Sequence, residues 1–148
     1  LPLIMVDSGN QISNGSVAFA QRYRAMVDAA LQRPSAARLE VNRERVGNSF
    51  QFDITLTNLS EVTLGSANSA TLHVIVYEEA HVGDTDHWVR AATFRSISNL
   101  APQATASFTV EIAPQGVVDC DKVHSVVIAD YRPGGTTGAY DTLQAAHQ

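Results

Sequence analysis

The chain has 148 residues and a net charge of −5 at pH 7, and it is 45% hydrophobic and 17% charged. This length suits one domain with a substantial apolar core. The negative charge argues against a nucleic-acid partner, because phosphate binding needs a basic face. No apolar run approaches the ~18 residues needed to cross a bilayer, so we expect no membrane insertion. A single cysteine, Cys120, excludes an internal disulfide or a CxxC pair within these residues.

Residues 1–33 are predicted to begin with two short strands. Leu3 to Val6 is an apolar run typical of a buried strand. The residues Ser8-Gly9-Asn10 favour a turn, and Gln11 to Ser13 fits a brief returning strand.

A helix is expected next, over residues 16–32. Ser13 or Asn14 could supply its N-cap oxygen, and Pro34 ends it, because the residue before a proline avoids the α region. Apolar side chains recur at three- and four-residue spacing and share one helix face, namely Phe19, Tyr23, Met26, Val27, Ala30 and Leu31.

Residues 34–148 are predicted to form strands, because apolar and polar residues alternate there with period two. The runs are 38–42, 50–57, 71–76, 88–97, 107–112, 123–131 and 139–145. About seven strands with no interleaved helix indicate an immunoglobulin-like antiparallel β-sandwich. The fold class is therefore mainly β, with a strand-strand-helix segment (1–33) before the sandwich (34–148).

Two resemblances follow from these residues. The order of proline, strand, turn, strand and helix in residues 1–33 resembles the C-terminal end of a thioredoxin-like fold, with Pro2 in the place of the family's cis-proline. That family's CxxC lies before this segment and has no counterpart here, so the resemblance implies a CxxC upstream of Leu1. The runs "FQFDITLTNLS" and "NLAPQATASFTVEI" resemble the immunoglobulin- or fibronectin-III-like modules of exported bacterial proteins. This implies an extracytoplasmic or cell-surface location.

The strongest cluster of possible metal ligands is "EEAHVGDTDHW", which contains His81, Asp84, Asp86 and His87. The carboxylates suit calcium and the imidazoles suit zinc. The alternative is a solvated loop between two strands, and the full calcium-loop pattern is absent. We therefore predict no metal ion and no cofactor, and keep these four residues as the metal candidates.

Cys120 and Trp88 are the other residues considered for chemistry. Cys120 stands between two aspartates, whose negative charge disfavours the reactive thiolate, so we predict a turn that enters a strand. Trp88 could line a sugar platform if exposed, but the only tryptophan of a sandwich is expected to anchor its core.

No pattern of catalytic residues stands out, so the sequence favours a non-enzymatic accessory, spacer or interaction module of a larger exported or cell-surface protein. Its expected partner is another protein or a second copy of this chain, bound through the apolar face of the 16–32 helix. An exposed apolar patch of that size is unfavourable in water, so we expect another surface to bury it. Two alternatives stay open. One is the C-terminal part of a thioredoxin-like thiol oxidoreductase, and the other is a carbohydrate- or metal-binding sandwich.

Overall fold

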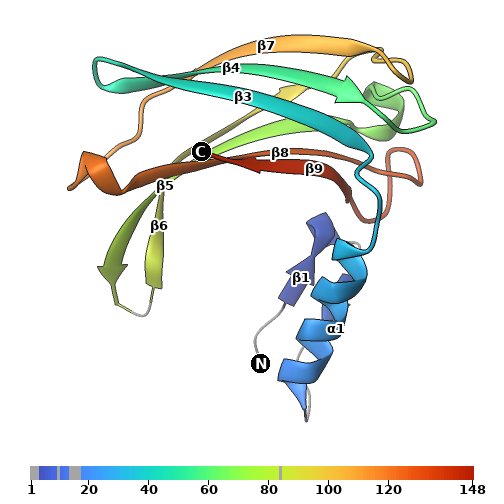
Figure 1. Ribbon diagram of the computed structural model, residues 1–148, viewed down its shortest axis with the longest axis horizontal. Helices are drawn as coiled ribbons and strands as arrows, with labels where there is room; N and C mark the ends of the chain where they lie inside the picture. Colours follow the sequence, from blue (N-terminus) through green and yellow to red (C-terminus); the bar gives the residue numbers. More distant parts are fainter. Residues whose placement is uncertain (1–3, 10, 14–17, 84) are drawn as a thin grey trace.

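The computed structural model describes residues 4–9, 11–13, 18–83 and 85–148, and these are mainly β-structure with one N-terminal helix (Figure 1). A short N-terminal unit comes first and contains β1 (Ile4–Val6), β2 (Gln11–Ser13) and α1 (Phe19–Leu31). Longer strands follow, and they are β3 (Ala37–Val46), β4 (Ser49–Asn58), β5 (Thr71–Val82), β6 (Thr85–Ser96), β7 (Thr105–Ile112), β8 (Val123–Tyr131) and β9 (Asp141–His147).

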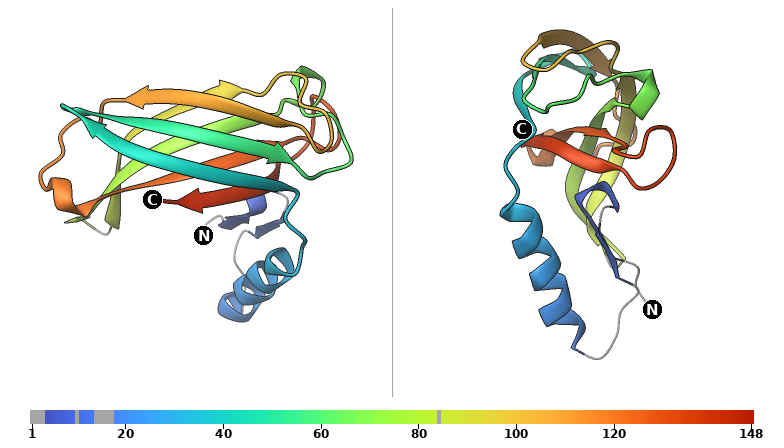
Figure 2. Two further views of the ribbon diagram at one scale, coloured as in Figure 1. Left: turned by 45° about the horizontal axis from the view of Figure 1, so that its top comes forward. Right: turned by 90° about the vertical axis from the view of Figure 1, so that its right-hand side faces the viewer.

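The longer strands form two antiparallel sheets that lie as layers in Figures 1 and 2. One sheet has the order β3–β4–β7, and the other has the order β6–β5–β8–β9. This is the predicted antiparallel sandwich. In a constant-type immunoglobulin domain the fourth strand pairs in the first sheet. Here the fourth strand of the sandwich, β6, pairs with β5 in the second sheet, as in the fibronectin-III-like variant of the fold.

The core is formed by apolar side chains that alternate with polar ones along the strands. Phe52 and Leu56 of β4 are fully buried, whereas Asp53 between them is exposed. Leu72 and Val76 are equally buried on β5 in the other sheet, and all of these apolar side chains belong to one cluster. The period-two pattern therefore predicted the inner faces of both sheets.

A buried asparagine fixes the connection after β4. The amide nitrogen of Asn58 donates to the backbone oxygens of Val62 and Leu100, at 2.8 and 2.9 Å. Its side-chain oxygen accepts from the backbone N–H of Ser60 at 3.0 Å. The side chain of Asn58 thus holds together two connections, the one after β4 and the one before β7.

The helix is shorter than predicted. It runs from Phe19 to Leu31, and residues 16 and 17 of the expected range lie outside the described residues, as does Asn14, the other expected N-cap. Ser13 is not its N-cap, because that residue ends β2, and the N-cap position is Ala18 in a left-handed conformation with φ 64°. No helix in the described part of the chain is long and apolar enough to cross a membrane.

The connection between β1 and β2 contains three described residues with positive φ, which are Asp7 at 61°, Ser8 at 53° and Gly9 at 96°. Positive φ is uncommon for residues other than glycine, so Asp7 and Ser8 adopt a backbone conformation that few side chains accept. Pro2 and Leu3, on which the thioredoxin-like correspondence partly depends, lie outside the described residues.

Candidate functional site

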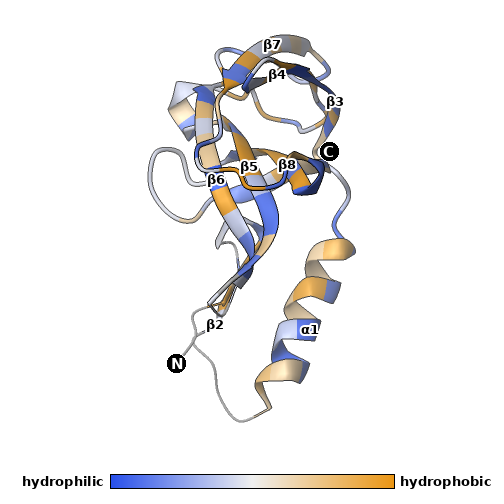
Figure 3. Cartoon of the chain, turned by 90° about the vertical axis from the view of Figure 1, so that its left-hand side faces the viewer, coloured by the Kyte–Doolittle hydropathy of each residue, from blue (hydrophilic) through white to orange (hydrophobic). Residues whose placement is uncertain are grey.

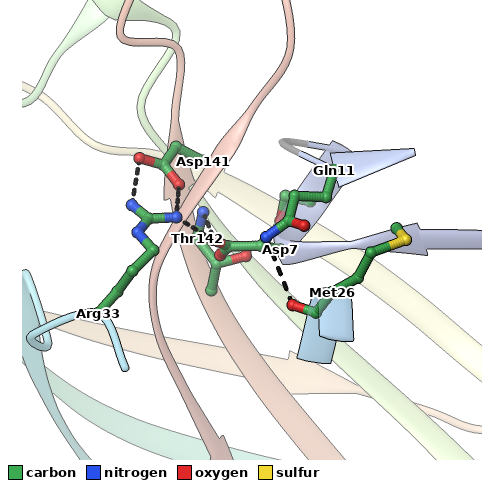
Figure 4. Close-up of polar contacts among 7 residues, drawn as sticks. Asp7, Gln11, Met26, Arg33, Asp141 and Thr142 are labelled. Atoms are coloured by element: carbon green, nitrogen blue, oxygen red, sulfur yellow. Dashed lines mark hydrogen bonds and ion pairs between the residues drawn. The ribbon is translucent and has the colours of Figure 1, made fainter. Parts of the chain in front are cut away.

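An ion-pair joint fastens the N-terminal unit to β9 (Figure 4). Arg33, just after α1, donates from Nη1 and Nη2 to the Asp141 carboxylate at 2.5 and 2.6 Å, and it also pairs with Asp7 in the β1–β2 turn. The Asp7 carboxylate accepts from the backbone N–H of Thr142 at 3.2 Å. The hydrogen bonding that Arg33 donates to the Asp141 carboxylate is the largest cause that raises the pKa of Arg33. We call Asp7, Arg33 and Asp141 the joint.

Within the N-terminal unit, α1 packs against the hairpin through Met26. That side chain is buried, and its backbone oxygen accepts a hydrogen bond from Nε2 of Gln11 at 3.4 Å (Figure 4). Tyr23 is half-buried and its ring lies 5.6 Å from the ring of Phe19. Only the middle of the predicted apolar face is therefore covered.

The remaining apolar side chains of α1 face outward. Phe19, Val27 and Leu31 are 57%, 44% and 75% exposed, and we call these three residues the α1 flank. Figure 3 shows the ribbon of α1 standing apart from the sheets. On the hairpin, Met5 and its cross-strand partner Ile12 are also more than half exposed.

A shallow pocket of about 280 Å³ continues from the flank to the sandwich. Ala30 and Leu31 of the last helical turn form one side, and Leu143 and Ala145 of β9 form the other. Pro34 also lines the pocket, which therefore lies where the chain leaves the N-terminal unit.

Of the metal candidates, His81, Asp86 and His87 lie on strands and not in the loop that the sequence suggested. β5 and β6 continue through this segment as a long hairpin, with Val82 paired to Thr85. Nδ1 of His81 lies 2.8 Å from Oδ1 of Asp86, and both side chains are largely exposed. Asp84 lies outside the described residues. In the described ranges no group of three His, Cys, Asp or Glu side chains is placed to hold a metal ion.

His87 instead belongs to a cluster around Tyr77 on the outer face of the four-stranded sheet. The ring of Tyr77 lies 5.4 Å from that of His87 on β6, 5.6 Å from that of His124 on β8 and 6.2 Å from that of His147 on β9. The oxygen of Tyr77 and Nε2 of His147 form a hydrogen bond of 2.8 Å. Nε2 of His124 lies 3.5 Å from Oε1 of Glu79. We call these five residues the histidine cluster.

A buried ion pair supports the same hairpin from the inner side. Arg90 donates from Nε and Nη2 to Oε2 of Glu78, at 2.7 and 2.6 Å. Oε1 of Glu78 accepts from the backbone N–H groups of Val118 and Asp119, at 3.0 and 2.6 Å. The bond from Asp119, followed by those from Arg90 and Val118, lowers the pKa of Glu78 against the opposing effect of burial. The pair therefore ties the connection before β8 to β5 and β6.

Trp88 does not anchor the core as expected. It is 41% exposed, and the guanidinium carbon of Arg90 lies 5.9 Å from its ring centre. The hairpin extends beyond the three-stranded sheet, so this part of its inner face has no opposing layer (Figure 1).

Cys120 lies in the predicted turn before β8. It is a free, exposed thiol that starts a one-turn 3-10 helix (Cys120–Lys122). The preceding Asp119 caps this turn by accepting from the backbone N–H of Asp121 at 3.0 Å.

No protein-family model matches the sequence, and no curated protein matches it. Among solved structures, the sporulation control protein Spo0M from Bacillus subtilis aligns over 78% of this chain and 48% of its own, at 14% identity and a TM-score of 0.47. A GH3 beta-glucosidase from Bifidobacterium adolescentis aligns over 76% of this chain and 16% of its own, at 15% identity and a TM-score of 0.38. The hypothetical protein PH1083 from Pyrococcus horikoshii aligns over 82% and 98%, at 9% identity and a TM-score of 0.38. The chain thus spans about half of Spo0M and a sixth of the beta-glucosidase.

Proposed function

We propose that this chain is a non-enzymatic interaction module that associates with a second copy of itself through the α1 flank. The observation that supports this proposal is the exposure of Phe19, Val27 and Leu31 on a helix that the sandwich leaves uncovered. Such a patch on a small protein marks an interaction site more often than it marks free surface.

A second copy suits the flank because a two-fold axis brings the same patch of both copies together. Full burial of a large apolar side chain is worth about 1.5–3 kcal/mol. The three side chains of the flank are roughly half exposed, so two copies together gain about 5–9 kcal/mol. Association costs about 4–15 kcal/mol of lost freedom. We therefore expect a weak dimer that dissociates on dilution.

Sedimentation velocity over a concentration series tests this proposal. The wild-type protein should shift from monomer to dimer as its concentration rises, and the double variant Phe19→Ser/Leu31→Ser should remain a monomer. Val118→Ser is the matched control, because Val118 is an exposed apolar side chain far from α1 in the sequence and should leave the dimer intact. A wild-type protein that stays monomeric, or a double variant that dimerises equally well, would refute the proposal.

The non-enzymatic role is also supported by two carboxylates that bind other parts of the fold. The carboxylates of Glu78 and Asp141 are both engaged by arginines and by neighbouring segments. The exported or cell-surface setting stays a prediction, which localisation of the full-length gene product would test. The thiol-oxidoreductase alternative also stays a prediction, and it requires a CxxC in the coding sequence before Leu1.

A further inference from the structure

The two sheets present different surfaces on their outer sides. Along β4 and β7 of the three-stranded sheet every outward position is polar, and these residues are Ser49, Gln51, Asp53, Thr55, Thr57, Thr105, Ser107, Thr109 and Glu111. The four-stranded sheet instead carries apolar and aromatic side chains on its outer side, namely Ile75, Tyr77, Val89, Phe94, Val126 and Ile128. We call these six residues the sheet patch.

The sheet patch is continuous across three strands. Phe94 on β6 stands opposite His73 on β5, which stands opposite Ile128 on β8. Two residues further along β5, Ile75 stands opposite Val126. Phe94 is 63% exposed, and the apolar side chains of β5 and β8 in the patch are half-buried outside the core cluster. Contiguous apolar surface on the outside of a sandwich marks a binding surface.

The charged groups on or beside the sheet patch are carboxylates paired with histidines. The pairs are His73 with Asp130 at 3.2 Å, His81 with Asp86 at 2.8 Å and His124 with Glu79 at 3.5 Å. Imidazole is largely uncharged at neutral pH, so this side of the molecule is negative there. Asp130 is largely covered, whereas the side chains of Glu79 and Asp86 are 54% and 76% exposed.

Neighbouring cations do not offset these carboxylates. β5, β8 and β9 contain no lysine or arginine. The nearby cations have partners of their own, because Arg90 is bonded to Glu78 on the inner side, Lys122 lies 4.0 Å from Asp119, Arg132 donates to the backbone oxygen of Thr136, and Arg33 belongs to the joint. Arg95 stands opposite the core residue Leu72 and therefore leaves the inner side of the sheet.

A shallow pocket of about 350 Å³ continues from the sheet patch toward the hairpin turn. Glu79, His81, Asp86 and His87 line it, and the ring of His87 lies 5.4 Å from that of Tyr77 in the patch. The surface thus joins an apolar area to a pocket with two exposed carboxylates.

We propose that the sheet patch binds an amphipathic helix of a partner protein, with basic side chains on the flank that faces the pocket. Four strands span about 14 Å across a sheet, and about ten helical residues have the same length. The apolar side of such a helix covers the patch, and its lysines or arginines reach Glu79 and Asp86. A second copy of this surface, or an anionic lipid surface, would place like charges against these carboxylates.

Acid should release the helix, because the histidines of the chain lie on or beside the sheet patch. Three are paired with carboxylates, and the other two, His87 and His147, contact the ring of Tyr77. Histidine gains its charge within the range from about pH 8 to pH 5. Protonation therefore neutralises the carboxylates pair by pair, adds positive charge beside Tyr77 and repels a basic helix.

Fluorescence anisotropy with a labelled leucine–lysine peptide of about four helical turns tests the proposal. The protein carries Phe19→Ser/Leu31→Ser, so that self-association through the α1 flank plays no part and the result is independent of that proposal. At about pH 7.5 it should bind this peptide and bind a leucine–glutamate peptide of the same pattern at least fivefold more weakly. Val89→Ser/Phe94→Ser should weaken binding by about tenfold. Glu79→Gln/Asp86→Asn should weaken it by about two- to fivefold, and a fall to about pH 5.5 should weaken it in the same direction.

Matched variants outside the four-stranded sheet serve as controls. Val46→Ser/Val62→Ser removes two exposed valines, and Glu40→Gln/Glu111→Gln removes two exposed carboxylates of the three-stranded sheet. Both should bind the leucine–lysine peptide like the parent protein. The proposal is overturned if the two peptides bind alike, if either control loses as much affinity as its counterpart in the sheet patch, or if acid strengthens binding. Binding to phosphatidylcholine–phosphatidylserine vesicles in place of the peptide would also overturn it and make this face a membrane site.

Discussion

The side chain of Asn58 makes three hydrogen bonds to backbone groups in a fully buried position. We expect Asn58→Ala to lower the free energy of unfolding by about 1–3 kcal/mol, because buried polar groups lose partners that water cannot replace there. Urea denaturation followed by tryptophan fluorescence measures this change. Ser60→Ala is the control, since it removes only the hydroxyl bonded to the same asparagine and should cost less. Equal losses of unfolding free energy in the two variants would show that the amide of Asn58 does not hold the two connections together.

Glu78 gives the protein a defined sensitivity to acid. Its pKa is lowered in the folded state, chiefly by the N–H of Asp119 and then by Arg90 and the N–H of Val118, so folding favours the ionised form. Its contribution to stability is therefore complete above about pH 4.3, the ordinary value for glutamate, and is lost as the pH falls through the lower folded value. We expect the stability difference between wild type and Glu78→Gln to shrink as the pH falls below that point. Urea unfolding at a series of pH values measures it.

The partner of Glu78 supplies the control for that prediction. Arg90→Met leaves the buried carboxylate without its guanidinium, whereas Glu78→Met/Arg90→Met removes both charges. The double variant should be more stable than Arg90→Met alone, because breaking one side of a buried pair costs more than replacing both sides. A stability difference between wild type and Glu78→Gln that is constant across the acid range would contradict the assignment.

At the scale of elements, the joint decides how the N-terminal unit is held. Arg33→Ala removes the bidentate bond to Asp141 and the pairing with Asp7. We expect faster protease cleavage between α1 and β3, with a loss of only about 1 kcal/mol in the stability of the sandwich. Limited proteolysis followed by mass spectrometry measures the cleavage rate. Arg24→Ala, on the exposed side of α1, should cleave like the wild type, and equal rates for all three proteins would show that the joint does not hold the unit.

The strands were predictable where polar and apolar residues alternate densely, as in β4. The sequence predicts both strands of the β5–β6 hairpin but places a loop between residues 76 and 88, because His81 and Asp86 are polar and largely exposed in that part of the hairpin. A run of polar residues is usually read as a loop. This inference is wrong for a strand that has no buried face, because such a strand needs no alternating apolar residues.

The histidine cluster was missed for a different reason. His124 and His147 are far from His87 in the sequence, and only the order and register of the strands bring them around Tyr77. Alternation shows that His124 lies on a solvent-facing position, but it does not say which strand is its neighbour. Pairing is decided by the whole sheet, so single-sequence patterns could not assemble this group of residues.

At the scale of the whole molecule, the predicted division at residues 33 and 34 has a direct test. The core is built from residues after Pro34, with Phe52, Leu56, Leu72 and Val76 among its buried members. Among the described residues, the N-terminal unit meets the sandwich at β9, through the joint, the hydrogen bond between the hydroxyls of Ser8 and Thr142, and the pocket beside that strand. We therefore expect a fragment of residues 34–148 to fold and to unfold in one cooperative step.

The expected loss of stability in this fragment is close to that of Arg33→Ala, because both remove the guanidinium bonded to Asp141. A loss of about 1 kcal/mol would lower the melting temperature by roughly 4 °C. Phe52→Ala is the contrasting variant, since emptying this fully buried site should cost about 3–5 kcal/mol in the full chain. Calorimetry of the three proteins measures both effects. If the fragment is unfolded while Arg33→Ala melts like the wild type, the N-terminal unit is part of the core and the division is wrong.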